Sequence, residues 1–383
     1  MRRAYTALIA LGLVSLLGDV VYEGSRGAVP AFLRGLGASA FVVGAISGVG
    51  EAFNLILRFV SGDVADRTGA YWSLTIIGYV LIVSIPLLAF TGRWEIAAIL
   101  ILTERLGKAL RSPARDVILS ECCKEIGRGK AFGIHEFLDQ IGAVLGPVLI
   151  SAVLLISNGN YRFAFSVMFI PFFAMLFFLA RARRLLGEVE RRAEKKEEKF
   201  SSREFTMYVS AVGLNTLSLI PASLILYQIS GEVGAWAVAL VYALIQLVDA
   251  PSALLAGHVY DKIRQKMLII PFVLSILPAP LTLLGGKINL IAAAIIFGFI
   301  LGMQESVYRA FVADIVPLER RGRAYGIFNS VYGFSALGSG LIFGALLQAG
   351  AYWLAVFAYS LFLNVIGIVL LNESWRKSKP RDK

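Results

Sequence analysis

The amino-acid sequence predicts an all-α membrane protein in which twelve helices cross the bilayer. Hydrophobic residues make up 57% of the 383 residues, and the mean hydropathy is +0.73. Only 16% of the residues are charged, whereas soluble domains usually contain about 25%. A water-soluble protein of this length cannot bury so much apolar surface in one core, so we expect lipid to surround much of the chain.

Twelve apolar runs are long enough to cross the membrane, because a helix of about 20 residues spans the hydrocarbon core. They fall near residues 5–30, 40–61, 72–91, 95–112, 130–157, 161–181, 204–230, 236–256, 267–285, 288–308, 323–349 and 352–372. A hydrophilic stretch separates the first six runs from the last six. We therefore expect an N-terminal six-helix bundle over 1–182, a cytoplasmic linker over 183–203, and a C-terminal bundle with a short tail over 204–383.

The positions of the basic residues predict how the chain is oriented. Most of the 37 Lys and Arg residues lie at the chain ends and in alternate loops. Cytoplasmic loops of membrane proteins are enriched in Lys and Arg, so both termini are expected in the cytoplasm. We expect the protein in the plasma membrane, which is the inner membrane of a cell that has two. The loops account for the net charge of +11, and no nucleic-acid partner is expected.

Two short motifs occur once in each half of the sequence. The motif GDVADR from Gly62 is similar to GHVYDK from Gly257, and RGKAFGI from Arg128 is similar to RGRAYGI from Arg321. In each half the first motif follows the second apolar run, and the second motif precedes the fifth. Such a parallel repeat is typical of transporters whose halves are related by an axis along the membrane normal.

These motifs resemble those of the major facilitator superfamily. The loop over 62–71 is similar to the family signature G-x-x-x-D-(R/K)-x-G-(R/K)-(R/K), although Ala70 and Tyr71 stand where two basic residues are usual. The second copy has Arg264 in place of a glycine, and the run PLERRGRA over 317–324 is similar to the loop before the family's eleventh helix. The resemblance implies two pseudo-symmetric six-helix bundles around a central cavity and transport by alternating access.

The resemblance also implies that the residues of these loops act as gates. Carboxylates at helix ends cap the next helix, and basic side chains there bind carboxylates of the opposite half. The implied gating residues are Gly62, Asp66, Arg67, Gly69, Gly257, Asp261, Lys262, Arg321 and Gly322.

A glycine and proline motif lies in the fifth apolar run. Gly142, Gly146 and Pro147 form a G-x-x-x-G-P pattern that resembles the drug antiporters of the superfamily in prokaryotes. The glycines permit close helix contact and the proline permits a bend. Val148 and Leu149 replace the Gly-Gly that follows in those antiporters. Both an antiporter hinge and a simple packing position therefore fit the motif.

Ionisable residues occur inside the apolar runs of the first half, although a charge at bilayer depth costs several kcal/mol. Helical spacing places three groups on single helix faces: Asp19 with Glu23 and Arg26, Glu51 with Asn54 and Arg58, and Glu104 with Lys108. We expect ion pairs that face the cavity. A carboxylate beside an arginine keeps its charge, and it binds a proton more readily once the arginine has moved away.

We predict that exchange of these pairs couples transport to protons. The predicted proton-coupling residues are Asp19, Glu23, Arg105, Glu51 and Glu104. The alternative is that the pairs only hold the first half together or fix one conformation.

The second half has fewer charges in its apolar runs and offers polar and aromatic side chains instead. An apolar, aromatic wall suits an amphipathic solute, although these aromatic rings could instead face lipid or neighbouring helices. The predicted residues of the substrate cavity are Arg26, Asn54, Lys108, Asn215, Tyr227, Gln246, Gln304 and Glu305.

The sequence contains neither a phosphate-binding loop for ATP nor an H-E-x-x-H metal motif. We therefore expect no enzyme activity, no metal and no cofactor. The prediction is a monomeric secondary transporter whose partners are a small-molecule solute, protons and the lipid bilayer, with proton-coupled efflux as the first reading. A proton symporter or facilitator that imports a metabolite is one alternative, and a membrane sensor or scaffold without transport is the other.

Overall fold

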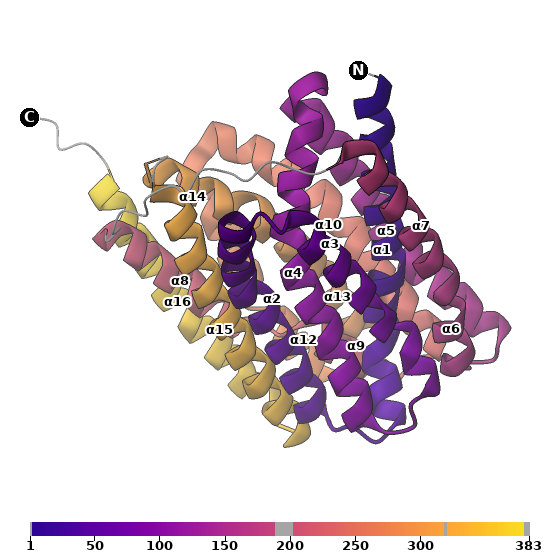
Figure 1. The fold of residues 1–383 in the computed structure, drawn as a ribbon. Helices are drawn as coiled ribbons and strands as arrows, with labels where there is room; N and C mark the ends of the chain where they lie inside the picture. Colours follow the sequence, from indigo (N-terminus) through magenta and orange to yellow (C-terminus); the bar gives the residue numbers. More distant parts are fainter. Residues whose placement is uncertain (1, 188–201, 318–319, 379–383) are drawn as a thin grey trace, which may run out of the picture. The chain divides into compact units, whose positions relative to one another are not determined.

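A computed structural model describes residues 2–187, 202–317 and 320–378, and every regular element within these ranges is a helix (Figure 1). Residues 188–201, which form most of the expected linker, lie outside the described residues. So do Leu318 and Glu319 of the run over 317–324, and the side chains of residues 128–130 in the repeated motif.

The six runs of the first half form helices, of which the third and the sixth are interrupted. Their elements are α1 (Arg2–Gly35), α2 (Ala40–Thr68), α3 (Tyr71–Val80), η1 (Leu81–Ser84), η2 (Pro86–Phe90), α4 (Trp94–Ile126), α5 (Arg128–Ile156), α6 (Tyr161–Val167) and α7 (Phe169–Leu186). The third run changes to 3-10 geometry after Val80. Pro86 contributes to this change because it has no backbone N–H to donate to the preceding turn.

The second half is more often interrupted. Its elements are α8 (Arg203–Ser218), α9 (Ala222–Ile229), α10 (Ala235–Ile263), η3 (Arg264–Leu268), α11 (Ile269–Leu274), α12 (Pro278–Leu284), α13 (Lys287–Met303), η4 (Gln304–Tyr308), α14 (Arg309–Ile315), α15 (Arg321–Gln348) and α16 (Trp353–Ser378). Pro221 and Pro278 stand at or just before the start of new helices, because proline favours the first helical turn and cannot continue an earlier one.

The helix lengths agree with the expected number of crossings. Among the described residues, 10 helical segments are long and apolar enough to span a membrane. One of them, Ala235–Leu284, has 50 residues, which is enough for two crossings. Helix α4 is not among the ten because charged side chains interrupt it, yet its 33 residues are long enough to cross. The predicted all-α fold of twelve spans in two sets of six is confirmed.

The chain divides into two compact units that do not follow the sequence halves alone. Unit 1 contains Met1–Ala38, Phe53–Lys195 and Gly234–Ala243, and unit 2 contains Ser39–Ala52, Lys196–Val233 and Leu244–Lys383. Each unit is thus mostly one half of the sequence plus a short segment from the other half. Helix α2 begins in unit 2 and continues in unit 1, whereas α10 begins in unit 1 and continues in unit 2.

In unit 1 the close approach of α1 and α5 depends on the glycines of the fifth run (Figure 1). A Cβ atom on Gly142 would lie 2.4 Å from the carbonyl oxygen of Leu16, and one on Gly146 would lie 2.6 Å from that of Val20. Any larger residue would therefore push the helices apart. The structure shows tight packing at this motif, while a role as an antiporter hinge remains a prediction.

In unit 2 the first turns of α2 pack on α15 through two pairs of glycines spaced four residues apart. A Cβ atom on Gly44 would lie 2.1 Å from the carbonyl oxygen of Gly340, and one on Gly340 would lie 2.3 Å from that of Gly44. Gly48 and Gly344 make similar backbone contacts with the opposite helix. Small residues at this spacing on both helices allow backbone-to-backbone packing within a bilayer.

Candidate functional site

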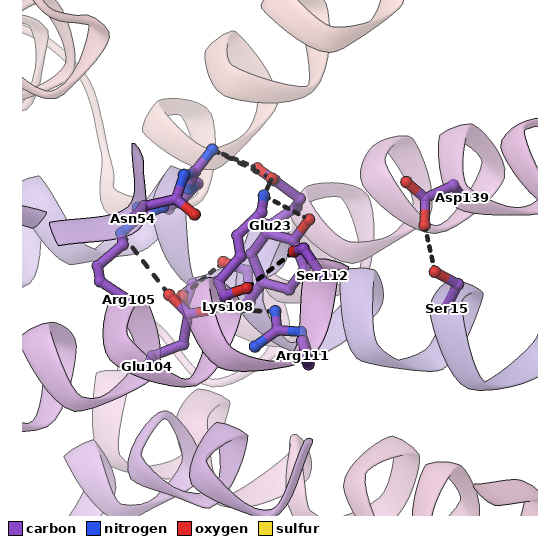
Figure 2. A network of polar contacts seen from close by, with 12 residues as sticks. Ser15, Glu23, Asn54, Glu104, Arg105, Lys108, Arg111, Ser112 and Asp139 are labelled. Carbon is purple, nitrogen blue, oxygen red and sulfur yellow. Dashed lines mark hydrogen bonds and ion pairs between the residues drawn. The ribbon is translucent and has the colours of Figure 1, made fainter. Parts of the chain in front are cut away.

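The carboxylate of Glu23 lies at the centre of a group of buried charges in unit 1 (Figure 2). Arg26, one turn further along α1, places its Nη1 atom 3.1 Å from Oε1 of Glu23. Helix α4 brings the Nζ atom of Lys108 to 3.9 Å from the same oxygen. The hydroxyl of Tyr242, on the part of α10 that belongs to unit 1, donates a hydrogen bond to Oε2. Three elements therefore meet at one carboxylate.

A second buried carboxylate, that of Glu104, binds two arginines of its own helix. The Nη2 atom of Arg111 lies 3.3 Å from Oε1 of Glu104, and the Nε atom of Arg105 lies 3.6 Å from Oε2. Arg111 is two turns after Glu104, so the helix repeat places both on one face. Helices α3 and α4 approach closely here, because a Cβ atom on Gly78 would lie 2.6 Å from the carbonyl oxygen of Gly107.

The ring of Tyr22 connects these two ion-paired groups. The Nζ atom of Lys108 lies 4.3 Å from the ring centre and donates to the hydroxyl at 2.9 Å. The guanidinium groups of Arg111 and Arg26 lie 5.2 and 5.6 Å from the same centre, within the range of cation–π attraction. Tyr22 is also an electrostatic neighbour of the buried carboxylate of Asp19. We call Asp19, Tyr22, Glu23, Arg26, Glu104, Arg105, Lys108 and Arg111 the charge cluster.

A further ion pair lies beside the charge cluster, where α1 meets α4 and α5. The hydroxyl of Ser15 donates to Oδ1 of Asp139 and accepts from Nη1 of Arg115 at 3.1 Å (Figure 2). The same guanidinium lies 4.0 Å from Asp139. Asp139 is also an electrostatic neighbour of Asp19, which ties this pair to the cluster. The second and third spans also pack on α4, where Ser61 donates a hydrogen bond to the carbonyl oxygen of Ala109 and Gly78 approaches Gly107.

The predicted polar face of the second span is divided between the two units. Asn54 is buried and accepts a hydrogen bond from Nη2 of Arg58 at 3.1 Å, and both belong to unit 1. Glu51 belongs to unit 2, where it is an electrostatic neighbour of Tyr332 together with Glu305. The structure therefore brings Asp19, Glu23, Arg105 and Glu104 into one cluster and places Glu51 elsewhere.

Unit 2 contains a buried polar network that carries no formal charge. Oδ1 of Asn215 accepts hydrogen bonds from Nε2 of Gln304 at 2.9 Å and from the hydroxyl of Tyr308 at 2.7 Å. Nδ2 of Asn215 donates to Asn364 at 2.8 Å. The hydroxyl of Tyr332 donates to Oε1 of Gln304 at 2.8 Å. This neutral network joins α8, α15, α16 and the element η4.

The element η4 is a single π-helical turn over Gln304–Tyr308. Such turns are rare and occur often at functional sites, because the extra residue changes the direction of the side chains around it. Here the turn directs Gln304 and Tyr308 to the same oxygen of Asn215. Of the other predicted cavity residues of this half, Gln246 is buried on α10 and Tyr227 is half-buried on α9.

The predicted gating residues make contacts close to their own position in the sequence. The Nε atom of Arg67 lies 3.0 Å from Asp63, one turn earlier on α2, and Asp66 accepts a hydrogen bond from the hydroxyl of Tyr71 at 2.9 Å. Gly69 ends α2 with a φ of 70°, a conformation that favours glycine. In the second half, Arg321 donates to the carbonyl oxygen of Ala313 at 2.6 Å, near the end of α14.

The other members of the second-half loops lie at the surface or in close contact. Asp261, Lys262 and Gly322 are exposed, and a Cβ atom on Gly257 would lie 3.0 Å from the hydroxyl oxygen of Ser306. Gly62 has more room, since its nearest neighbour is the Pro113 ring at 3.5 Å. The gating role of these loop residues stays a prediction.

Sequence reasoning did not single out several members of these groups, among them Tyr308 and Tyr332 of the neutral network. Tyr22 lies three residues after Asp19 and four before Arg26, so helical spacing could have revealed it. Ser15 lies four residues before Asp19 on the same face. Asn364 is a polar residue in an otherwise apolar stretch of the last span, and Arg111 follows Glu104 by two turns. The sequence did not indicate which residues of other helices these side chains would contact.

The fold and the buried charges define a helical membrane protein of the transporter type. A family model of the Major Facilitator Superfamily matches residues 11–287 and 205–383. The chain therefore belongs to the Major Facilitator Superfamily and is a multi-pass membrane protein, and the resemblance in its loop motifs is confirmed.

Two relatives match the chain over almost its whole length. An uncharacterized protein of Mycobacterium tuberculosis is 35% identical over 378 residues, which cover 95% of this chain and 92% of that protein. An uncharacterized MFS-type transporter of Methanocaldococcus jannaschii is 24% identical over 379 residues, which cover 94% of this chain and 93% of that protein.

Solved structures of transporters share the fold. The nucleoside transporter NupG has a TM-score of 0.73 at 15% identity, covering 98% of this chain and 100% of its own. An inward-facing bacterial homolog of the human lysosomal transporter Spinster has a TM-score of 0.72 at 13% identity, covering 100% of this chain and 99% of its own. At these identities the likeness concerns the fold alone.

Proposed function

We propose that the protein is a proton-coupled secondary transporter that moves a small amphipathic solute by alternating access. The observation that carries this proposal is the position of Glu23, a buried carboxylate with ionic or hydrogen-bonding partners on α1, α4 and α10. A buried charge of this kind is costly, so its partners must be present whenever it is ionised. A movement of one helix that removes partners favours a neutral, protonated carboxylate.

Asp19 and Glu23 are the proposed proton carriers. They lie one turn apart on α1, both are buried, and Tyr22 and Lys108 stand close to both. Arg105 and Glu104 form the next pair along the cluster and are proposed to move with α4. Glu51 is proposed as a separate protonation site in unit 2, beside Tyr332.

The solute is proposed to be a small organic molecule with an apolar part. The neutral network around Asn215 offers hydrogen bonds without charge, and aromatic rings such as Phe328 and Tyr332 lie beside each other at a centroid distance of 6.2 Å. Solved structures of this fold include nucleoside and peptide transporters, which supports a small organic solute here. Of the predicted cavity residues, Arg26 and Lys108 would contact its polar end.

Two directions of transport follow from different observations. Export in exchange for protons is supported by the tightly packed Gly142 and Gly146, whose motif resembles that of antiporters. Import together with protons, or facilitated import, uses the same cluster with the opposite coupling.

We further propose that the chain works as a monomer in the plasma or inner membrane with both termini in the cytoplasm. The loops around Arg67 and Arg321 would then gate the cytoplasmic side.

Flux measurements test the proposal and decide the direction. The purified protein is placed in proteoliposomes with an acidic interior that contain a pH-sensitive dye, and a panel of amphipathic compounds is added outside. For an exporter in the inverted orientation, a transported compound raises the interior pH. Co-transport with protons instead acidifies the interior further.

Variants show whether the cluster carries the coupling. Asp19→Asn and Arg105→Ala are expected to abolish proton flux, while Arg93→Gln, at an exposed pair with Glu95, retains it. If no compound of the panel produces proton or solute flux, the result favours a membrane sensor or scaffold over a transporter. Flux that persists unchanged in both cluster variants would contradict the assignment of the proton carriers.

A further inference from the structure

A hollow of about 240 Å³ lies on the surface of unit 1, between α3 and α7. Aliphatic side chains form most of its lining, and two guanidinium groups follow them along α7. The lining residues are Ile76, Leu176, Leu179, Ala180, Arg183 and Arg184. Ala180 and both arginines are exposed, so the hollow is open to the surroundings of the protein.

Hydrogen bonds hold the two walls of the hollow together at the end where the arginines lie. The indole Nε1 atom of Trp72, in the first turn of α3, donates to the carbonyl oxygen of Gly187 at 2.7 Å. Gly187 follows the last residue of α7, and its own N–H donates to the carbonyl oxygen of Arg183 at 2.9 Å. The start of α3 is therefore fixed to the end of α7, and the hollow is a defined part of unit 1.

The hollow lies where the hydrocarbon of the membrane meets the lipid headgroups. Helix α7 is apolar from Phe169 to Ala180, and the next four residues include Arg181, Arg183 and Arg184. An apolar helix crosses the hydrocarbon core, and arginines at its end extend into the headgroup layer. The aliphatic lining is thus at the depth of acyl chains and the guanidinium groups are at the depth of lipid phosphates, whichever side of the membrane this end faces.

The charge of the two helices that line the hollow is positive. Neither α3 nor α7 contains an acidic residue. Arg183 and Arg184 can bind a phosphate beside another acceptor, because a guanidinium has five N–H donors. Cations in the last turn of a helix also stabilise its dipole, but that role does not require an apolar hollow next to them.

A second hollow, in unit 2, provides an internal comparison. It measures about 300 Å³ and is lined by Phe41, Ala345, Gln348 and Ala349. Its lining offers an amide but no cation. Of these two hollows, only the one between α3 and α7 combines apolar walls with positive charge.

We propose that the hollow between α3 and α7 binds an anionic phospholipid. Part of one acyl chain lies against Ile76 and Leu176, and the phosphate binds Arg183 and Arg184. Arginine binds phosphate oxygens through parallel hydrogen bonds, and basic pockets between membrane-spanning helices suit anionic headgroups. A zwitterionic phospholipid has the same phosphate, but its ammonium group offsets the charge. The proposal is independent of transport and of its direction.

Lipid binding to the purified full-length protein tests the proposal. Dioleoylphosphatidylglycerol or dioleoylphosphatidylcholine is titrated into the detergent solution, and native mass spectrometry measures how much lipid remains bound. We expect the anionic lipid to reach half-saturation at a concentration roughly tenfold lower than the zwitterionic lipid. Glycerol phosphate carries the charge without acyl chains, and it is expected not to displace the anionic lipid at equal concentration.

A double variant assigns the preference to the two arginines. Arg183→Gln combined with Arg184→Gln is expected to raise the half-saturating concentration of the anionic lipid roughly tenfold, to that of the zwitterionic lipid. The matched control is Arg93→Gln combined with Arg162→Gln. It removes two exposed arginines beyond the opposite ends of these spans and should leave the preference unchanged.

A third variant tests the apolar part of the hollow. Ala180→Phe places a ring in the hollow while both arginines remain, and it is expected to weaken binding of the anionic lipid several-fold. Ala180, Arg183 and Arg184 are all exposed. Loss of binding at an unchanged melting temperature in lipid-free detergent is therefore assigned to the hollow and not to unfolding.

Four results would overturn the proposal. They are equal half-saturation by the two lipids, undiminished anionic-lipid binding in the Arg183 and Arg184 double variant, undiminished binding in Ala180→Phe, and displacement of the lipid by an equal concentration of glycerol phosphate. The last result would show that the charge alone binds a phosphate. None of these results bears on the proposed transport, which depends on the charge cluster.

Discussion

The hydroxyl of Tyr242 donates a hydrogen bond to the carboxylate of Glu23, and this contact joins residues 219 positions apart in the sequence. Tyr242 lies near the start of α10, on the short segment Gly234–Ala243 that belongs to unit 1. The second half of the sequence thus supplies one partner of a carboxylate that lies in the first span. Any movement of α10 relative to α1 changes the environment of Glu23 directly.

Tyr242→Phe is expected to destabilise the protein by about 1.5–3 kcal/mol, because it removes a buried hydrogen bond to a charged group while keeping the ring. Chemical unfolding in detergent micelles measures the loss. Tyr352→Phe is the matched control, since Tyr352 is exposed next to Trp353. Equal stability of the two variants would show that the Tyr242 hydrogen bond contributes nothing.

Glu104→Gln is expected to cost about 3–5 kcal/mol of folding stability, because it leaves Arg105 and Arg111 buried without their carboxylate. The double variant Glu104→Gln with Arg111→Met should recover part of this loss, since it removes one of the two cations. The exposed pair of Glu95 with Arg93 has a similar separation of 3.5 Å. Because solvent screens that pair, Glu95→Gln should unfold at nearly the same denaturant concentration as the unmodified protein.

Asn215→Ala is expected to lower the stability of the protein by at least about 2 kcal/mol. It would leave polar atoms of Gln304, Tyr308 and Asn364 buried without a partner, and each such group costs about 1–3 kcal/mol. Combining it with Asn364→Ala in a double-mutant cycle should give a total loss smaller than the sum of the single losses. Strict additivity would contradict a shared network. Asn289→Ala is the control, because this half-buried residue donates a hydrogen bond to the carbonyl oxygen of Gly285, just before α13.

Gly44→Ala is expected to destabilise the protein by about 1–3 kcal/mol, because the new methyl group would lie 2.1 Å from the carbonyl oxygen of Gly340. Gly133→Ala provides the comparison, since it lies in α5 with no atom near its Cβ position. Alanine there should stabilise the helix by up to about 1 kcal/mol. The two substitutions are chemically identical, so opposite signs in an unfolding experiment isolate the packing of α2 on α15.

The sequence predicted those parts of the site that depend on spacing within one helix. The i and i+4 pattern placed Asp19 beside Glu23, and the apolar runs predicted the spans from which they project. The pattern could not show which helix would face α1. The structure places Lys108 next to Glu23, and it pairs Arg105 with the adjacent Glu104. Partner choice across helices depends on close packing at residues such as Gly78 and Gly107, which a single sequence does not reveal.

The second half was harder to predict from the sequence for a different reason. Gln304 and Tyr308 both donate to Oδ1 of Asn215, because a π-helical turn lies between α13 and α14. No residue type specifies such a turn, so helical spacing taken from the sequence fails after Met303. The division of α2 between two units was also hard to predict, because it depends on glycine contacts with α15, which lies far away in the sequence.

The exchange of short segments between the two units bears on what happens if the backbone is cut. A protease that cleaves between Gly187 and Ser202 would separate the halves covalently, yet the N-terminal fragment would still hold Ser39–Ala52 against α15 and the C-terminal fragment would still hold Gly234–Ala243 against α1. Neither fragment alone contains a whole unit. The two pieces should therefore co-purify after cleavage, and genes that encode them separately should reconstitute the protein only when they are expressed in the same cell.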